Sequence, residues 1–135
     1  MQSDEMMKEI LDSTETIASV GLSGNEEKVS HWVAVYLQGQ GFRVIPVNPT
    51  TDKILGEKSY PDLVSIPGKI DVVQIFRRSE DVPPIVEDAI KIGAKVIWMQ
   101  EGIVNEEAAA RAREAGLQVV MDACMRATHQ RLCRS

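Results

Sequence analysis

The sequence predicts a Rossmann-like α/β domain, a doubly wound parallel sheet of about five strands with helices on both faces. Short apolar runs alternate with segments whose apolar residues recur at helical spacing, and glycines or prolines mark most of the boundaries. Strands separated by helical patterns of about 10–15 residues are typical of βαβ crossovers in a parallel sheet. No internal repeat or low-complexity linker divides the chain, so we expect a single domain spanning residues 1–135.

The first third of the chain predicts two helices and two strands. A serine begins a helical pattern over residues 3–13, and a nearly continuous apolar run over residues 16–20 indicates a buried strand that ends at a glycine. Over residues 26–38 the apolar residues recur at i, i+3, i+4 and i+7, which predicts a helix with one buried stripe. Residues 42–47 are strand-like, with Pro46 near the end because proline cannot donate to the ladder.

The remainder of the chain continues the alternation. Between residues 48 and 69 the sequence is irregular and predicts only a short strand near Tyr60 and a helical turn after Pro61. Prolines in the first turn and an asparagine cap mark the starts of two further helices. The predicted elements are a strand at 70–76, a helix at 83–93, a strand at 95–99, a helix at 105–116 and a strand at 117–121.

Composition and charge restrict the class of function. Apolar residues make up 44% of the chain and charged residues 26%, as in ordinary soluble domains. With 15 basic against 20 acidic residues the net charge is -5, which argues against a nucleic-acid partner. No apolar run approaches the roughly 20 residues that span a bilayer, and no signal-peptide order is present, so we expect neither membrane insertion nor secretion. Two cysteines nine positions apart indicate no disulfide framework and favour a reducing, cytoplasmic setting.

The turn after the first predicted strand is the candidate ligand site. Residues 21–25 read Gly-Leu-Ser-Gly-Asn and lead toward the next helix. Ligands of such sheets bind outside the carboxyl ends of the strands. Gly21 permits unusual backbone angles, Gly24 permits close approach of a ligand, and backbone amides left free at the bend would hold a pyrophosphate. Tight βα turns also use glycine for packing alone, so both interpretations stay open at this point.

The next strand end bears on which nucleotide would bind. A dinucleotide site needs a carboxylate there to hold a ribose hydroxyl, but residues 47–49 are Val-Asn-Pro, and the third glycine of the G-x-G-x-x-G fingerprint is missing. NAD is therefore disfavoured. A P-loop is excluded because no Gly-Lys-Ser/Thr follows the turn.

Motifs distributed over nearly the whole chain, from about residue 14 to residue 132, carry a family resemblance. They are TIASVG (16–21), YL (36–37), GFRVIPVNP (41–49), LGE (55–57), IFRR (75–78), GAK (93–95), WMQ (98–100), AGL (115–117) and VMD (120–122). With these motifs the sequence resembles the small stand-alone CoA-binding proteins, which are related to the N-terminal CoA-binding domain of the succinyl-CoA synthetase alpha subunit.

The resemblance implies non-covalent binding of coenzyme A or an acyl-CoA, with the pyrophosphate on the first turn and the adenosine end beside the second strand. The third and fourth strand ends would border the rest of the cofactor. A 3′-phosphate needs a basic group, for which Lys28, Lys53, Arg77 and Arg78 are the candidates. The residues so implied are Gly21, Leu22, Ser23, Gly24, Asn25, Val47, Asn48, Pro49, Phe76, Arg77, Met99, Gln100 and Glu101.

Several departures from the family pattern lie near the predicted site. Leu22 replaces a smaller residue and is expected to narrow the pocket, and Glu26 and Glu27 would repel a phosphate. A unit charge about 6 Å away costs roughly 3 kcal/mol at an effective dielectric constant near 20. The alternative hypothesis is therefore that divergence or engineering has reshaped this face to bind a protein. Its proposed contacts are His31, Trp32, Met125 and Arg126.

Catalysis has little support in the sequence. There is no nucleophile-elbow motif, no metal-ligand pair and no acid–base couple. The histidines at 31 and 129 have no second ligand at metal spacing, so we expect no metal. In succinyl-CoA synthetase the phosphorylated histidine belongs to a second domain that this sequence lacks, so the resemblance implies no catalysis by this chain alone.

Overall fold

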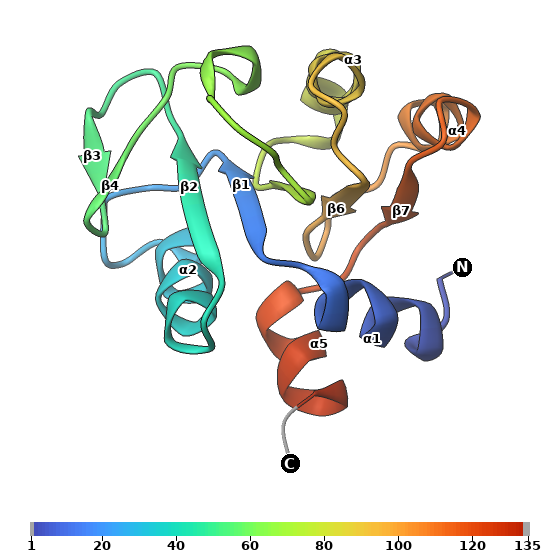
Figure 1. Ribbon diagram of the computed structural model, residues 1–135, viewed down its shortest axis with the longest axis horizontal. Coiled ribbons are helices and arrows are strands. Elements are labelled where there is room, and N and C mark those ends of the chain that lie inside the picture. The colour runs from blue at the N-terminus through green and yellow to red at the C-terminus, as the bar shows by residue number, and fades with distance from the viewer. Residues whose placement is uncertain (1, 134–135) are drawn as a thin grey trace.

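Five parallel strands form the centre of the computed structural model, which describes residues 2–133 (Figure 1). The strand order is β2-β1-β5-β6-β7, and every neighbouring pair is parallel. This confirms the predicted Rossmann-like sheet. The strands are β1 (Thr16–Val20), β2 (Arg43–Val47), β5 (Val72–Ile75), β6 (Val96–Met99) and β7 (Gln118–Val120).

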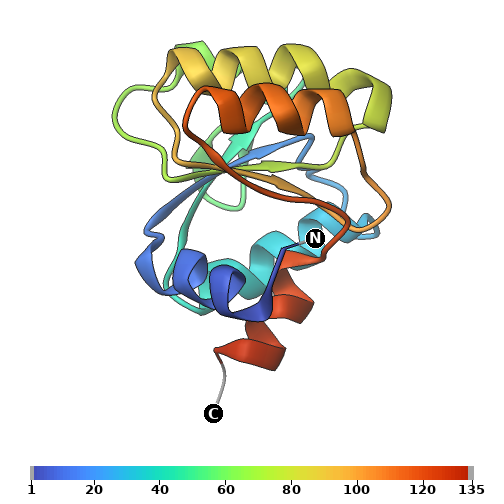
Figure 2. The same cartoon turned by 90° about the vertical axis from the view of Figure 1, so that its right-hand side faces the viewer.

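Helices cover both faces of the sheet, as predicted (Figure 2). Two helices lie on one face and three on the other, and each face has its own apolar core. The first face carries α3 (Val82–Lys91) and α4 (Glu106–Glu114); the second carries α1 (Asp4–Ser13), α2 (Val29–Gly39) and α5 (Met125–Leu132). Both cores take apolar side chains from every strand, so neither face of the sheet is polar; only the first residues of β1, β2 and β7 are not fully buried.

Local capping explains where two of the helices begin. The Ser3 hydroxyl accepts a hydrogen bond from the Met6 amide at 3.1 Å, and the Asn105 side chain accepts one from the Ala108 amide at 2.9 Å. Each bond satisfies one of the amides that a helix start leaves without a partner.

Two helices differ from the prediction. The second helix begins at Val29 rather than near residue 26, because residues 21–28 form a series of turns. The last helix, α5, was not predicted. Only Met125 and Thr128 of this helix are buried, so the sequence has no extended apolar stripe from which the helix could be predicted.

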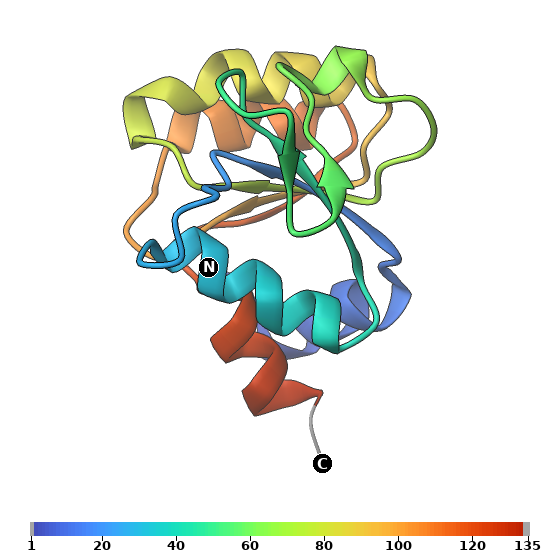
Figure 3. The same cartoon turned by 90° about the vertical axis from the view of Figure 1, so that its left-hand side faces the viewer.

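The irregular stretch after β2 contains a small antiparallel hairpin beside the sheet (Figure 3). Its strands are β3 (Lys53–Ile54) and β4 (Glu57–Lys58), joined through Leu55 and Gly56, both at positive φ. The predicted strand near Tyr60 is a single bridge to Val47, and the predicted helical turn is the 3-10 helix η1 (Leu63–Ser65). A second 3-10 helix, η2 (Ser79–Asp81), leads into α3.

The first and last helices of the described chain pack against each other. Arg131 Nη1 lies 2.8 Å from Asp4 Oδ2. The Gln2 side chain donates to the Met121 carbonyl at 2.8 Å and accepts from the Met121 amide at 3.2 Å. The N-terminal segment is therefore attached to the end of β7.

Candidate functional site

Gly21 lies at the switch point of the sheet, where the chain leaves β1 between β2 and β5. Its φ is +92°, and a Cβ on it would lie 2.7 Å from the Phe76 carbonyl oxygen and 3.1 Å from Arg77 Cδ. The Gly21 amide donates to the Val47 carbonyl at 3.0 Å, and the Phe76 amide donates to the Val20 carbonyl at 2.8 Å. These contacts hold the ends of three strands together, and only glycine fits between them.

The backbone amides of the turn over residues 21–25 are mostly bonded within the protein. Those of Gly21 and Leu22 donate to the Val47 and Ser19 carbonyls, at 3.0 and 3.4 Å. The Ser23 amide donates to the Ser30 hydroxyl at 3.1 Å, and the Asn25 amide donates to the Ser23 hydroxyl at 3.0 Å. The expectation of a free amide cradle is therefore wrong for these four residues. Within the turn, only the Gly24 amide lacks a partner in the described part of the chain.

Two side chains expected at the ligand instead stabilise this turn. Leu22 is fully buried in the core beneath α1, α2 and α5, so the expectation that it narrows a pocket is wrong. The Asn48 amide nitrogen donates to the Leu22 carbonyl at 3.0 Å, and its oxygen accepts from the Thr50 amide at 2.9 Å. Met99 is likewise fully buried, in the core beneath α3 and α4.

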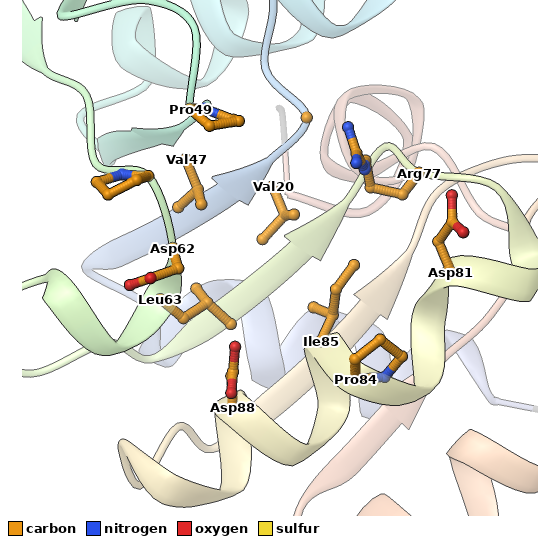
Figure 4. A pocket seen from close by; sticks show the side chains of 12 residues that line it. Val20, Val47, Pro49, Asp62, Leu63, Arg77, Asp81, Pro84, Ile85 and Asp88 are labelled. Carbon is orange, nitrogen blue, oxygen red and sulfur yellow. The ribbon is translucent and has the colours of Figure 1, made fainter.

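A cavity of about 300 Å³, the α3-side cavity, opens where β1 and β2 end (Figure 4). Four of the expected residues line it: Gly21, Val47, Pro49 and Arg77. The remaining lining, which sequence reasoning missed, comes from the end of β1, the segment after β4, η2 and α3: Val20, Pro61, Asp62, Leu63, Asp81, Pro84, Ile85 and Asp88.

Helical spacing could have identified part of this missed lining. Asp81, Ile85 and Asp88 stand at i, i+4 and i+7, beside the buried positions Val86 and Ala89. Figure 4 shows Ile85 and Asp88 projecting from α3 into the cavity. A carboxylate therefore reaches the cavity from α3, although the end of β2 supplies none.

A second cavity of about 450 Å³, the β6-side cavity, lies beyond Arg77 along the same edge. Phe76, Gln100 and Glu101 line it, as the resemblance implied, together with Val29 and Cys124. Arg77 lines both this cavity and the α3-side cavity. The two cavities therefore adjoin and follow the carboxyl ends of the strands.

A third cavity, the α5-side cavity of about 370 Å³, shares Val29, Glu101 and Cys124 with the β6-side cavity. Glu27 and Arg126 complete its charged lining. Glu26 lies outside all three cavities, in a separate hollow beside Trp32.

The candidate cations differ in their availability. Arg78 lies 3.3 Å from Asp81 and 3.7 Å from Glu80, whereas Arg77 forms no ion pair with any residue between 2 and 133. Lys28 is the N-cap of α2 and Lys53 belongs to the β3–β4 hairpin; neither lines these three cavities. Of the four candidates, Arg77 alone lines both the α3-side and the β6-side cavity, and Arg78 lines only the latter.

The four residues proposed as a protein-binding face do not form one exposed surface. Met125 is fully buried, so that part of the expectation is wrong. The Trp32 side chain is 60% exposed, and His31 Nδ1 donates to the Ser23 carbonyl at 3.0 Å. Arg126 lines the α5-side cavity.

Among residues 2–133, no group of three or more His, Cys, Asp or Glu side chains is placed to hold a metal ion. None of the helices in that range is long and apolar enough to cross a bilayer.

Comparison with known proteins identifies the family. The model of the CoA binding domain family matches residues 15–130. The uncharacterized protein YneT of Bacillus subtilis is 45% identical over 123 residues, which cover 91% of each chain. The ADP-forming acetate–CoA ligase II of Archaeoglobus fulgidus is 32% identical over 82 residues; the match covers 59% of this chain and 12% of the ligase.

A solved structure agrees with this match over the whole chain. The crystal structure of Prb, a PH1109 protein redesigned for binding, superposes with a TM-score of 0.97 at 41% identity, covering 100% of this chain and 95% of Prb. The sheet topology and the sequence match lead to one conclusion: this chain belongs to the CoA binding domain family.

Proposed function

We propose that the chain binds CoA or an acyl-CoA non-covalently along the carboxyl edge of its sheet. The observation that carries this proposal is the pair of adjoining cavities, the α3-side and β6-side cavities, that share Arg77. A long cofactor with a nucleotide at one end and a flexible thiol arm at the other suits two cavities joined by a cation. Membership of the CoA binding domain family supports the same ligand.

The nucleotide end is assigned to the α3-side cavity. Val47, Leu63 and Ile85 supply apolar walls for the adenine ring, and Asp88 supplies a carboxylate for a ribose hydroxyl. The first turn was expected to hold the pyrophosphate. Because the amides of the first turn are mostly bonded within the protein, we assign the pyrophosphate to Arg77.

Two further parts of the proposal concern catalysis and location. We propose that the chain performs no catalysis alone, because the described residues supply no metal cluster and the sequence supplies no nucleophile motif. The thiols of Cys124 and Cys133 are both free, which favours a cytoplasmic location.

Calorimetric titration with CoA tests the assignment. Arg77→Gln should weaken binding by roughly 10- to 100-fold, since a hydrogen bond to a charged group contributes about 1.5–3 kcal/mol. Arg43→Gln is the matched control: it removes the same charge at the opposite end of β2 and should change affinity less than twofold. No binding to the wild-type chain, or equal losses in the two variants, would overturn the proposal.

A second candidate function is protein binding through α2, favoured by one observation. Val29, Trp32 and Val35 recur every third residue on α2 and are 69%, 60% and 49% exposed. We assign this strip to a second copy of the chain, because an apolar strip can meet its own copy across a two-fold axis. Sedimentation velocity should show a concentration-dependent dimer that Trp32→Ser abolishes. A monomer at every concentration excludes this candidate.

A further inference from the structure

Cys124 lies where the β6-side and α5-side cavities meet, and its neighbours fix it there. The Ala123 amide donates to the Met99 carbonyl at 3.3 Å, and the Ala123 carbonyl accepts from the Trp98 indole at 2.8 Å. On its other side the Met125 amide donates to Gln100 Oε1 at 3.0 Å. The half-buried thiol is thus held beside the end of β6 by bonds on both sides, and it lines two cavities.

Gln100 gives independent evidence that the β6-side cavity receives a polar ligand. The side chain is only 3% exposed and lines the cavity. Its oxygen faces two donors, the Met125 amide and Gln74 Nε2, and the backbone donor fixes which way the Gln100 amide is turned. The Nε2 donors have no partner within the described chain. Gln100 Nε2 is not among the buried atoms that lack a partner, so it is accessible from the cavity, where a ligand carbonyl can accept from it.

The second thiol has a different environment. Burial and the Asp12 carboxylate raise the pKa of Cys133, which follows the last turn of α5 and lines none of the three cavities. A raised pKa leaves less of the reactive thiolate at neutral pH. Cys133 is therefore a control thiol within the same chain for any reaction of Cys124 that depends on the cavity.

We propose that Cys124 is a thiol–disulfide exchange site for the thiol end of CoA. The inference rests on the proposed function, because the nucleotide end would bring the disulfide of a CoA dimer to this position. Gln100 Nε2 would donate to an amide carbonyl of the pantetheine arm. Along the edge of the sheet, the nucleotide would lie in the α3-side cavity, the phosphates at Arg77 and the thiol in the β6-side cavity.

The exchange balances with CoA disulfide as the oxidant. The Cys124 thiolate attacks one sulfur of CoA disulfide, a Cys124–CoA disulfide forms, and the original S–S bond breaks. Cys124 is oxidised, and the departing CoA is reduced to a thiolate that takes up the proton released by Cys124. The product is a chain carrying one covalent CoA, which a thiol reductant removes.

Intact mass spectrometry after timed incubation with CoA disulfide tests the site, with glutathione disulfide as the probe that lacks a nucleotide. We expect one CoA adduct on the wild-type chain and on Cys133→Ser, and none on Cys124→Ser. Serine is favourable at a helix N-cap, so the Cys124→Ser variant should fold. The reaction with CoA disulfide should be at least tenfold faster than with glutathione disulfide.

A conservative variant separates cavity binding from simple exposure of the thiol. Gln100→Glu keeps an acceptor for the Met125 amide but removes both Nε2 donors, so it should reduce the preference for CoA disulfide over glutathione disulfide at least threefold. An adduct on Cys133, or equal rates with the two probes, overturns the inference.

Titration with reduced CoA distinguishes failure of the exchange site from failure of the proposed function. CoA binding without an adduct on Cys124 defeats the exchange site and leaves the proposed function intact. Absence of CoA binding together with equal rates for the two disulfides defeats both.

Discussion

Adding one methyl group at Gly21 tests the geometry on which the proposed ligand edge depends. Gly21→Ala places a Cβ 2.7 Å from the Phe76 carbonyl oxygen, a backbone atom that cannot rotate away. The positive φ of +92° costs roughly 1–2 kcal/mol for alanine. Displacing the packed strand end adds about 1–3 kcal/mol. Together these effects would remove a large part of the roughly 5–15 kcal/mol that stabilises a domain.

Gly41→Ala is the matched control for Gly21→Ala. Gly41 has φ +96°, but a Cβ there meets nothing within 4 Å, so this variant carries the backbone strain without the clash. In urea unfolding followed by circular dichroism, Gly21→Ala should have the lower midpoint by roughly 0.7–2 M, taking a slope of about 1.5 kcal/mol per molar. Equal midpoints would refute the reasoning that the Phe76 carbonyl excludes a side chain at Gly21.

Three further substitutions test other parts of the structure. Leu22→Ala should lower the free energy of unfolding by about 2–5 kcal/mol, because Leu22 is a core residue; a loss below 1 kcal/mol in urea unfolding would contradict that placement. Ser19→Ala should stabilise the fold by about 1 kcal/mol, since the buried Ser19 hydroxyl has no partner among residues 2–133, and a lower thermal midpoint would count against this. Burial raises the pKa of Asp71, but hydrogen bonds from the Glu15 and Thr16 amides, together with the charges of Lys95 and Lys69, outweigh it and leave the pKa below its ordinary value. The contribution of ionised Asp71 to the free energy of unfolding is therefore present above about pH 4 and is lost as pH falls through the lowered pKa. Asp71→Asn should destabilise the fold by about 1–2 kcal/mol at pH 7 and by less at pH 3. A loss of stability that does not depend on pH would contradict the assignment.

The fold was predictable because its signals are local. The Ser3 and Asn105 caps stand next to the helices that they start, and the apolar strands are separated by clear helical periods. Helix α5 lacked such a signal. Its buried Met125 is held by Gln74 and Gln100, which come from β5 and the end of β6, so its place depends on contacts far apart in the sequence.

The candidate site was predictable in position but not in detail. The turn at Gly21 and the ends of the later strands follow from strand order alone. The partners of the turn amides do not: the Ser30 hydroxyl comes from α2 and the Asn48 side chain from beyond β2. Asp88 enters the α3-side cavity from a helix that the family motifs do not mention.

The attachment of the N-terminal segment to the last elements bears on how the chain is synthesised. Among the described helices α1 leaves the ribosome first, yet Met121 and Arg131, the partners of Gln2 and Asp4, follow nearly all of the sheet. Until α5 emerges, the apolar residues of α1 are only partly shielded from solvent; they are Met7, Ile10 and Leu11. A nascent chain halted after β6 should therefore be a better chaperone substrate than the released protein, which shields these residues.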